Sequence, residues 1–322
     1  MESHIFAKYP GKEKLSLAVL CQNLFDSQKK SWPAFAQCHH DLASIRTREI
    51  SGGDYNVTLQ YNPARAVSAG AAVDAESIKK RPCFLCAGNR PAQQNGILYR
   101  KDYEILCNPA PIFDQHFTVV AIHHQPQEIS SSLTRLLQLA ADAAPDYTVL
   151  YNGPACGASA PDHLHFQMIP AYTLPFLDTL RDLPLLEEVL SVQFFKGENL
   201  DRSIVILESK NVDVLTEVFS RLLKTAQRIL STDDEPLMNL LCAYENNAWR
   251  LTIFLRRKHR PAAYFAEGRD RIFVSPGAID MAGVIITPLL ADFDRLTADE
   301  IRSIYQEVSL DEMVLNKIIK AL

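Results

Sequence analysis

The sequence predicts an α+β protein whose strands form an antiparallel sheet with helices packed against it. One observation is the order of elements around an amphipathic helix at 133–144, where strand, strand, helix, strand and strand follow one another. A second is that this order recurs around residues 190–290, although no repeated sequence is visible. A third is the presence of short hairpin-type turns between strands, which favour antiparallel neighbours.

Composition describes an ordinary globular chain and excludes several classes of protein. The 322 residues are 47% hydrophobic and 22% charged, enough to bury a large core in one large or two modest domains. The net charge of −5 is unfavourable for general nucleic-acid binding, and no apolar run approaches the roughly 20 residues that span a bilayer. We therefore expect neither a nucleic-acid partner nor a membrane. Seven cysteines without a disulfide-type pattern, and no convincing secretory signal, predict free thiols in a reducing, cytoplasmic location.

The N-terminal part of the chain contains clear helix and strand patterns. Residues 1–50 are expected to be helical, since apolar residues recur at helical spacing between 14 and 30 before Pro33 interrupts them. The patterns further predict a strand at 54–61, a hairpin-like passage at 96–111, a strand at 116–122, a helix at 133–144 ended by Pro145, and a strand at 147–151.

The C-terminal part repeats these kinds of element. The patterns predict a helical stretch at 170–190, two strands around a turn at 197–199, a helix at 211–230, and strands at 237–243 and 249–255 joined by a turn at 245–247. Thr297 with Glu300 three residues later predicts a capping box at the start of a helix. The basic run 256–260 is either a solvated strand edge or a second phosphate-facing lip.

The strongest chemical signal is the stretch YNGPACGASAPDHLHFQMIP at 151–170. In a strand, His163, His165 and Gln167 face one side, with Leu164, Phe166 and Met168 on the apolar side. The small residues just upstream can bring backbone N–H groups close to a phosphate. The alternative is a pair of core histidines whose hydrogen bonds are satisfied inside the protein.

The second signal is the pair Cys83-x-x-Cys86 in RPCFLCAGNRP at 81–91. Two thiolates at this spacing can bind one zinc ion from a tight turn, with the other ligands supplied elsewhere in the chain. A redox-active pair is the alternative, but the loop-forming residues 88–91 follow Cys86 where a redox motif would start a helix.

These two motifs together resemble the histidine-triad superfamily, in the branch whose motif is His-x-His-x-Gln. That branch contains the galactose-1-phosphate uridylyltransferases, the diadenosine tetraphosphate phosphorylases and the GDP-L-galactose phosphorylases. CFLCAGN is very similar to the zinc-binding segment of the uridylyltransferases, and the C-terminal part resembles the end of GDP-L-galactose phosphorylase. The resemblance covers about residues 55–315 and is specific at 81–91 and 151–170.

The resemblance implies roles for particular residues. His165 would attack an α-phosphorus and carry a covalent nucleotide, and Gln167 would hold the non-bridging oxygens. The substrate-binding residues implied or suggested on this basis are Asn152, Gly157, Ser159, Arg65 and Asn108. Arg65 can equally be a surface arginine, Asn108 can equally be a turn residue before proline, and Asn152 and Ser159 can structure the loop.

The resemblance also implies that the metal ligands are completed by His163 and by either His123 or His124. His124 is favoured because it begins the turn after the strand at 116–122. The expected cofactor is therefore a structural Zn²⁺ held by Cys83, Cys86, His124 and His163, which would fix the strand that presents His165.

The expected architecture is a histidine-triad-like antiparallel half-barrel with flanking helices, built from two pseudo-symmetric halves. It divides into an N-terminal helical segment (1–50), a catalytic half (51–185) and a degenerate second half that completes the pocket (186–322). The implied enzyme is a nucleotidyltransferase of the hexose-1-phosphate uridylyltransferase, NDP-hexose phosphorylase or dinucleoside tetraphosphate phosphorylase type. Its substrates would be a nucleoside-diphosphate sugar or dinucleoside polyphosphate, with phosphate or a sugar 1-phosphate as acceptor. A homodimer is a possible assembly.

Two other functions remain as alternatives at this stage. The chain could be a non-catalytic, zinc-stabilised nucleotide sensor of the same fold, although intact His165 and Gln167 argue against this. It could also be a zinc-dependent nucleic-acid module, although the acidic net charge and the single Cys-x-x-Cys argue against that.

Overall fold

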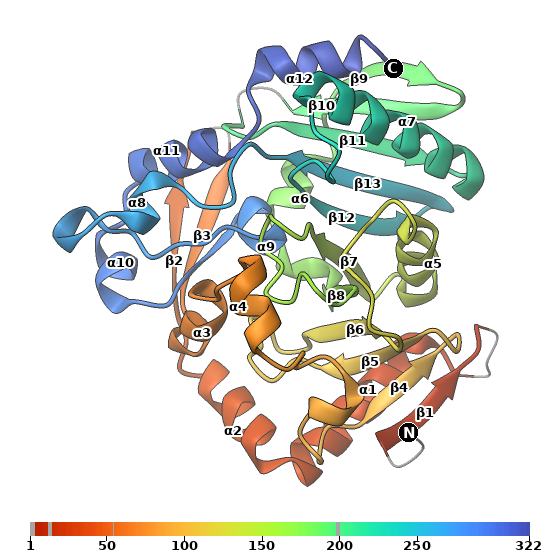
Figure 1. Cartoon of the computed structure of the whole chain (residues 1–322), viewed down its shortest axis with the longest axis vertical. Helices are drawn as coiled ribbons and strands as arrows, with labels where there is room; N and C mark the ends of the chain where they lie inside the picture. The colour runs from red at the N-terminus through yellow and green to blue at the C-terminus, as the bar shows by residue number, and fades with distance from the viewer. Residues whose placement is uncertain (1–3, 12–14, 54, 198–199) are drawn as a thin grey trace.

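One large sheet runs through the protein and organises the other elements (Figure 1). Within residues 4–11, 15–53, 55–197 and 200–322, which this computed structural model describes, the strands form an eleven-stranded sheet and a three-stranded sheet. The large sheet has the order β1-β4-β5-β6-β8-β7-β12-β13-β11-β10-β9, and apart from the parallel pair β1–β4 its neighbours are antiparallel. This is the mixed α+β, mainly antiparallel architecture that the sequence predicts.

The first half of the sheet is a five-stranded unit with one helix packed on it. Its strands lie in the order β4-β5-β6-β8-β7, with α5 between β6 and β7 along the chain. The elements are β4 (Gly96–Tyr99), β5 (Tyr103–Cys107), β6 (Phe117–Ala121), α5 (Leu133–Ala143), β7 (Tyr147–Asn152) and β8 (His165–Pro170).

The second half repeats this topology. Its strands lie in the order β9-β10-β11-β13-β12, with α7 between β11 and β12. The two halves meet where β7 pairs antiparallel with β12, so the sheet has two pseudo-symmetric halves. The elements are β9 (Leu185–Val189), β10 (Val192–Gly197), β11 (Ile204–Ser209), α7 (Val212–Leu230), β12 (Met238–Glu245) and β13 (Ala248–Leu255).

The halves differ in the connection between their last two strands. β12 and β13 are joined by a tight turn in which Asn246 and Asn247 have left-handed backbone. The equivalent connection between β7 and β8 is the long segment 153–164. The first half therefore carries an irregular loop at a position where the second half has a plain hairpin.

The remaining elements cover the sheet and come from both ends of the chain. The small sheet has the order β14-β3-β2, so that a C-terminal strand pairs in parallel with an N-terminal one. The elements are β1 (Ile5–Tyr9), α1 (Leu17–Ser31), α2 (Pro33–Leu42), β2 (Arg46–Ser51), β3 (Asn56–Tyr61), α3 (Ala66–Ala69), α4 (Ala75–Lys80), α6 (Phe176–Thr179), α8 (Ala262–Phe265), α9 (Ala278–Met281), β14 (Val284–Thr287), α10 (Leu290–Arg295), α11 (Ala298–Val308) and α12 (Glu312–Ile319).

Two hydrophobic cores lie on the two faces of the large sheet. The first contains the buried sides of α1, α5, α7 and α12, and the second contains β3, β14, α9 and α11. Strand β8 contributes to both cores because its side chains alternate. Phe166 and Met168 join the first core, whereas Ile169 joins the second, so His165 and Gln167 face the second.

Three strands, β1, β2 and β9, lie in ranges where the sequence analysis expected helices. Residues 1–50 contain the expected helices but also β1 and β2, and 170–190 contains only short helical turns before the edge strand β9. β9 is an edge strand and buries few side chains, so its sequence lacks the apolar alternation of a central strand. Its exposed Glu187 and Glu188 are residues that also suit a helix. The expected strand at 54–61 is observed as β3 from Asn56, while Asp54 and the expected turn residues Glu198 and Asn199 lie outside the described residues.

Among the residues that the structure describes, no helix combines the length and the apolar character needed to cross a bilayer.

The capping box at the start of α11 is confirmed and can be tested. Thr297 Oγ1 accepts from the backbone N–H of Glu300, whose side chain accepts from the backbone N–H of Thr297 at 2.9 Å. Replacing Thr297 with Ala should lower the free energy of unfolding by about 1 kcal/mol, because one helix N–H loses its acceptor. Urea unfolding of both proteins measures this. Thr297→Ser, which keeps the oxygen, should stay near wild type, and an equal loss in both variants would contradict the assignment.

Candidate active site and metal centre

His165 is the first residue of β8 and lies where β7 and β8 separate. Its Nδ1–H donates to the carbonyl of His163 at 2.8 Å, which leaves the lone pair on Nε2. Burial lowers the pKa of His165 to about 4, although the hydrogen bond to the His163 carbonyl acts in the opposite direction, so the ring is neutral near pH 7. Among the described residues no group bonds Nε2, and that atom is not sealed from solvent. The imidazole is therefore held neutral, with the lone pair of Nε2 available.

Gln167 lies on the same sheet face and is oriented by His116. The backbone N–H of Ile112 donates to Nδ1 of His116 at 3.2 Å, so the His116 proton must sit on Nε2. That Nε2–H donates to Oε1 of Gln167 at 2.8 Å. Burial and nearby Arg65 lower the pKa of His116 to about 3, so it stays neutral. Gln167 consequently presents its amide N–H groups, and they meet no acceptor in the described part of the chain.

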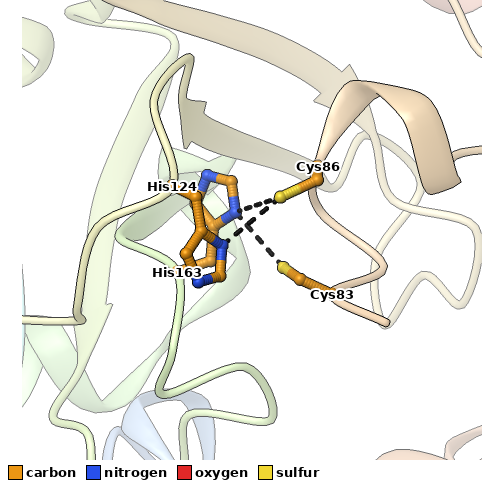
Figure 2. Close-up of side chains that lie close together, drawn as sticks. All are labelled: Cys83, Cys86, His124 and His163. Carbon is orange, nitrogen blue, oxygen red and sulfur yellow. Dashed lines mark hydrogen bonds between the residues drawn. The ribbon is translucent and has the colours of Figure 1, made fainter. Parts of the chain in front are cut away.

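Cys83, Cys86, His124 and His163 form a cluster in which all four ligand atoms lie within 4.8 Å of one another (Figure 2). Nδ1 of His163 is 3.2 Å from Sγ of Cys83, and Nδ1 of His124 is 3.3 Å from Sγ of Cys86. His123 is not part of this group. The structure thus brings together the four residues expected from the sequence and selects His124 over His123.

The chemistry of this cluster fits a metal ion. Nε2 of His163 lies 2.7 Å from the carbonyl oxygen of Ala121, to which it donates, so the Nδ1 lone pair points at the two thiols. Two sulfur and two nitrogen donors are the set that zinc binds in closed tetrahedral sites. Because the carbonyl of His163 accepts from His165, His163 connects the four-residue cluster to the His165 ring.

The small-residue loop packs against the second half. Gly157 has φ +98°, and a Cβ there would lie 3.0 Å from Cα of Gly277. Oδ1 of Asn152 accepts from Nδ2 of Asn239 and from the N–H of Ala278, both at 2.8 Å. The structure therefore places Gly157 and Asn152 at the contact between loop 153–164 and the start of α9. Asn152 still has an Nδ2 with no protein acceptor among the described residues.

The other expected binding residues lie at the rim of this region. The carbonyl of Ser159 accepts from Nη2 of Arg81 at 3.4 Å, and its hydroxyl contacts no protein partner within the described chain. Nη1 of Arg65 donates to the carbonyl of Ala110 at 2.8 Å, and its charge is close enough to lower the pKa of His116. Arg65 thus lies near His116, the residue that orients Gln167, and is not a free surface residue. Oδ1 of Asn108 accepts from the N–H of Ala110 and closes a turn.

The basic run 256–260 follows β13. Its first residue, Arg256, is buried, so at this position the run is neither a solvated strand edge nor an open phosphate-facing lip. Arg256 is 2% exposed, and its guanidinium donates to five uncharged oxygens. These are the side-chain oxygen of Asn239 and the carbonyls of Val308, Pro276, Lys258 and His259. Asn239 in turn donates to Asn152. A buried cation is therefore connected through Asn239 to the start of loop 153–164.

The sequence matches two family descriptions that divide the chain much as the sheet does. Residues 24–170 match "Domain of unknown function (DUF4922)", and residues 197–321 match "GDPGP1-like, C-terminal domain". Galactose-1-phosphate uridylyltransferase from Lactococcus lactis subsp. lactis (strain IL1403) is 26% identical over 243 residues, which is 64% of this chain and 48% of that protein. The chain thus spans about half the length of this curated relative.

Solved structures of yeast Ap4A phosphorylase Apa2 share the fold. The form without a named ligand aligns with a TM-score of 0.58 at 15% identity, covering 93% of this chain and 95% of that chain. The complex with Ap4A aligns with a TM-score of 0.62 at 14% identity, covering 92% and 99%. The chain therefore has the fold of these phosphorylase structures, and its sequence is similar to that of a galactose-1-phosphate uridylyltransferase.

Several residues that support this site were not predicted as site residues from the sequence. His116 orients Gln167, and Gln127 binds the backbone of His165 through its side chain. Arg81 donates to Asp162 at 2.8 Å beside the loop, and its buried Nη1 has no protein partner in the described structure. The adjacent cysteine motif was the one signal pointing to Arg81. Gln127 lies in an irregular segment with no motif, so nothing in the sequence marked it.

Glu235 provides a pH-dependent test of the contact between the halves. Its carboxylate accepts from the N–H of Ile129 at 2.7 Å and from the Tyr151 hydroxyl at 2.8 Å, yet burial raises its pKa to about 7. A raised carboxyl pKa stabilises the fold below the unfolded pKa, and this contribution is lost as the pH rises through the folded value.

The wild type should therefore lose stability between pH 5 and pH 8, by at most about 3 kcal/mol from this residue. Glu235→Gln, which can accept from Ile129 and donate to Tyr151, should show a smaller loss. Urea unfolding of both proteins across this pH range measures the difference, and parallel curves would contradict the assignment.

Proposed function

We propose that the chain is a nucleotidyltransferase or phosphorylase that transfers a nucleoside monophosphate through a covalent nucleotidyl-histidine on His165. The observation that carries the proposal is the fixed tautomer of His165, whose Nδ1–H donates to His163 while Nε2 has no protein partner within the described residues. A neutral imidazole with a free lone pair is a good nucleophile near pH 7.

The reaction needs two displacements at phosphorus. In the first, the Nε2 lone pair forms an N–P bond, and the bond from the α-phosphorus to its bridging oxygen breaks with its electrons going to the leaving phosphate. In the second, an oxygen of the acceptor phosphate attacks the same phosphorus and the N–P electrons return to Nε2. Because the leaving group is itself a phosphate of low pKa, no strong general acid is required. The positive charge on the intermediate ring is shared with Nδ1–H, which the His163 carbonyl accepts.

Other side chains would hold the charge that develops on the transferring phosphoryl group. Gln167 offers amide N–H groups because His116 occupies its oxygen. Asn152 and Ser159 each retain a polar group without a protein partner in the described chain, and Arg65 and Arg81 supply positive charge at the rim. Their roles as substrate contacts are part of this proposal, as is that of Gly157 in keeping the loop backbone open.

The names of the relatives support the substrate class that we propose. One is named a galactose-1-phosphate uridylyltransferase, and the structural neighbours include Ap4A phosphorylase with bound AMP or Ap4A. We therefore infer that the donor is a nucleoside-diphosphate sugar or a dinucleoside polyphosphate, and that the acceptor is phosphate or a sugar 1-phosphate. A nucleotide sensor without catalysis would not need the lone pair of His165 to be kept free.

We also propose that the four-residue cluster holds a structural zinc ion. Cys83, Cys86, His124 and His163 would be its ligands, and the ion would neutralise the thiolates and fix the ring of His163. The ion takes no part in the transfer. Its contribution is to hold the His163 backbone, whose carbonyl fixes the tautomer of His165.

Replacing His165 with Ala tests the covalent intermediate. The wild type should become labelled when incubated with an α-labelled GDP-sugar, UDP-sugar or dinucleoside tetraphosphate, and the label should be acid-labile and alkali-stable. His165→Ala should abolish labelling without lowering the melting temperature by more than a few degrees. His40→Ala, which changes an exposed histidine in α2, is the control. Nucleotide binding by the wild type without any label would favour the sensor.

Replacing Cys83 with Ser tests the metal. The wild type should contain one zinc per chain, and Cys83→Ser should lower both zinc content and melting temperature, with activity lost as a consequence. Cys38→Ser, a surface cysteine outside the cluster, should leave all three unchanged. Metal analysis and thermal unfolding measure the effect. A fully stable wild type that contains no zinc would overturn the zinc assignment.

A further inference from the structure

We propose that Gln127 is a positioning residue for the nucleophile, acting as a side-chain bridge between β7 and β8. The proposal rests on the transfer reaction described above, because its consequence is the placement of His165. Gln127 lies in segment 123–129, which connects β6 to α5, and it is 2% exposed.

The strand register shows what Gln127 replaces. β7 and β8 pair regularly from Tyr147 opposite Pro170 to Leu150 opposite Gln167. Two residues further in the same register, Asn152 would face His165 and the two would bond directly. The direct ladder ends before that point, because the strands separate where loop 153–164 begins.

The Gln127 amide fills the gap and makes the missing bonds. Its Oε1 accepts from the backbone N–H of His165 at 2.8 Å. Its Nε2 donates to the carbonyl of His165 at 3.0 Å and to the carbonyl of Asn152 at 2.9 Å. One side chain thus satisfies both backbone groups of His165 and ties them to the end of β7. An apolar side chain of the same size would leave three buried backbone groups unpaired.

The segment that carries Gln127 is itself firmly held. The N–H of Leu164 donates to the carbonyl of Gln125 at 2.7 Å, and the N–H of Gln127 donates to the carbonyl of Pro161 at 3.1 Å. The N–H of Ile129 donates to Glu235. The same segment includes His124 of the metal cluster. Segment 123–129 is therefore hydrogen-bonded to residues 161–164, and through Gln127 it also holds the backbone of His165.

The geometry assigns Gln127 a specific effect on the reaction. The His165 ring is fixed at Nδ1 by His163, while its backbone is fixed by Gln127. If the backbone is released, Nε2 shifts relative to the phosphorus, and a misplacement of about 1 Å lowers an attack rate by roughly 100-fold. Substrate binding should persist, since Gln127 is buried and its side-chain hydrogen bonds go to backbone groups of Asn152 and His165.

A matched pair of variants tests the proposal. Gln127→Met should lower the single-turnover labelling rate of His165 by about 100-fold while nucleotide affinity and zinc content stay within threefold of wild type. Gln125→Met is the control, because it makes the same change in the same segment at an exposed side chain. Gln127→Glu keeps the shape and one acceptor but loses the donors, and it should be impaired like Gln127→Met. Wild-type labelling rates in both Gln127 variants would overturn the proposal.

A structural readout separates this inference from the proposed function. Hydrogen exchange at the backbone N–H of His165 should be slow in the wild type and in Gln125→Met, and fast in Gln127→Met, with exchange at Phe166 unchanged. If no donor labels the wild type, the transfer reaction is wrong, and the exchange result alone then decides whether Gln127 positions His165. Simultaneous loss of nucleotide binding, zinc and exchange protection throughout β8 would show a general folding role and would overturn the positioning role.

Discussion

The hydrogen bond from Nδ1–H of His165 to the carbonyl of His163 determines what the rest of the site can do. It fixes the imidazole tautomer and leaves Nε2 without a hydrogen-bond partner among the described residues. His163 can hold its carbonyl in place because its own ring is bound on both sides, by Ala121 at Nε2 and by the cysteine cluster at Nδ1. Gln127 binds the backbone of His165, and His116 binds the side-chain amide of Gln167. Each of these contacts limits the motion of His165 or Gln167. In the proposed reaction, this would keep the nucleophile correctly placed relative to the phosphorus.

The repeated topology explains why only one half carries this arrangement. In both halves a helix follows the third strand along the chain, and the last strand pairs with that third strand in the sheet. In the first half the last two strands separate into loop 153–164, whereas in the second half a two-residue turn keeps β12 and β13 paired to their ends. The C-terminal part of the chain contributes hydrogen bonds to this site. Ala278 at the start of α9 and Asn239 donate to Asn152, and Glu235 accepts from Ile129. The site is therefore built by one half and supported by the other.

Periodicity predicted the helices α5 and α7 and the strands around them, because their apolar faces are wide and regular. It failed at β1, β2 and β9, which lie at sheet edges and bury few side chains. Residues joined by short motifs, such as Cys83 with Cys86 and His163 with His165, could be picked out as candidates from their spacing, and the family resemblance implied their roles. Gln127 could not, because its partners are backbone groups that any sequence supplies. The burial of Arg256 within the basic run could not either, because four of its five acceptors are backbone carbonyls. A residue that binds main chain leaves no partner residue in the sequence to reveal it.

The buried guanidinium of Arg256 has a consequence for binding in solutions of different salt content. Its five acceptors are all uncharged oxygens, and one of them, Asn239, leads directly to Asn152 at the loop. Dissolved counter-ions cannot approach a cation enclosed in this way, so its field is screened far less than that of a surface lysine. An anionic ligand on the loop would feel an attraction that persists at high ionic strength. Discrimination between anions would then depend on the exposed rim charges, whose influence fades as salt is added.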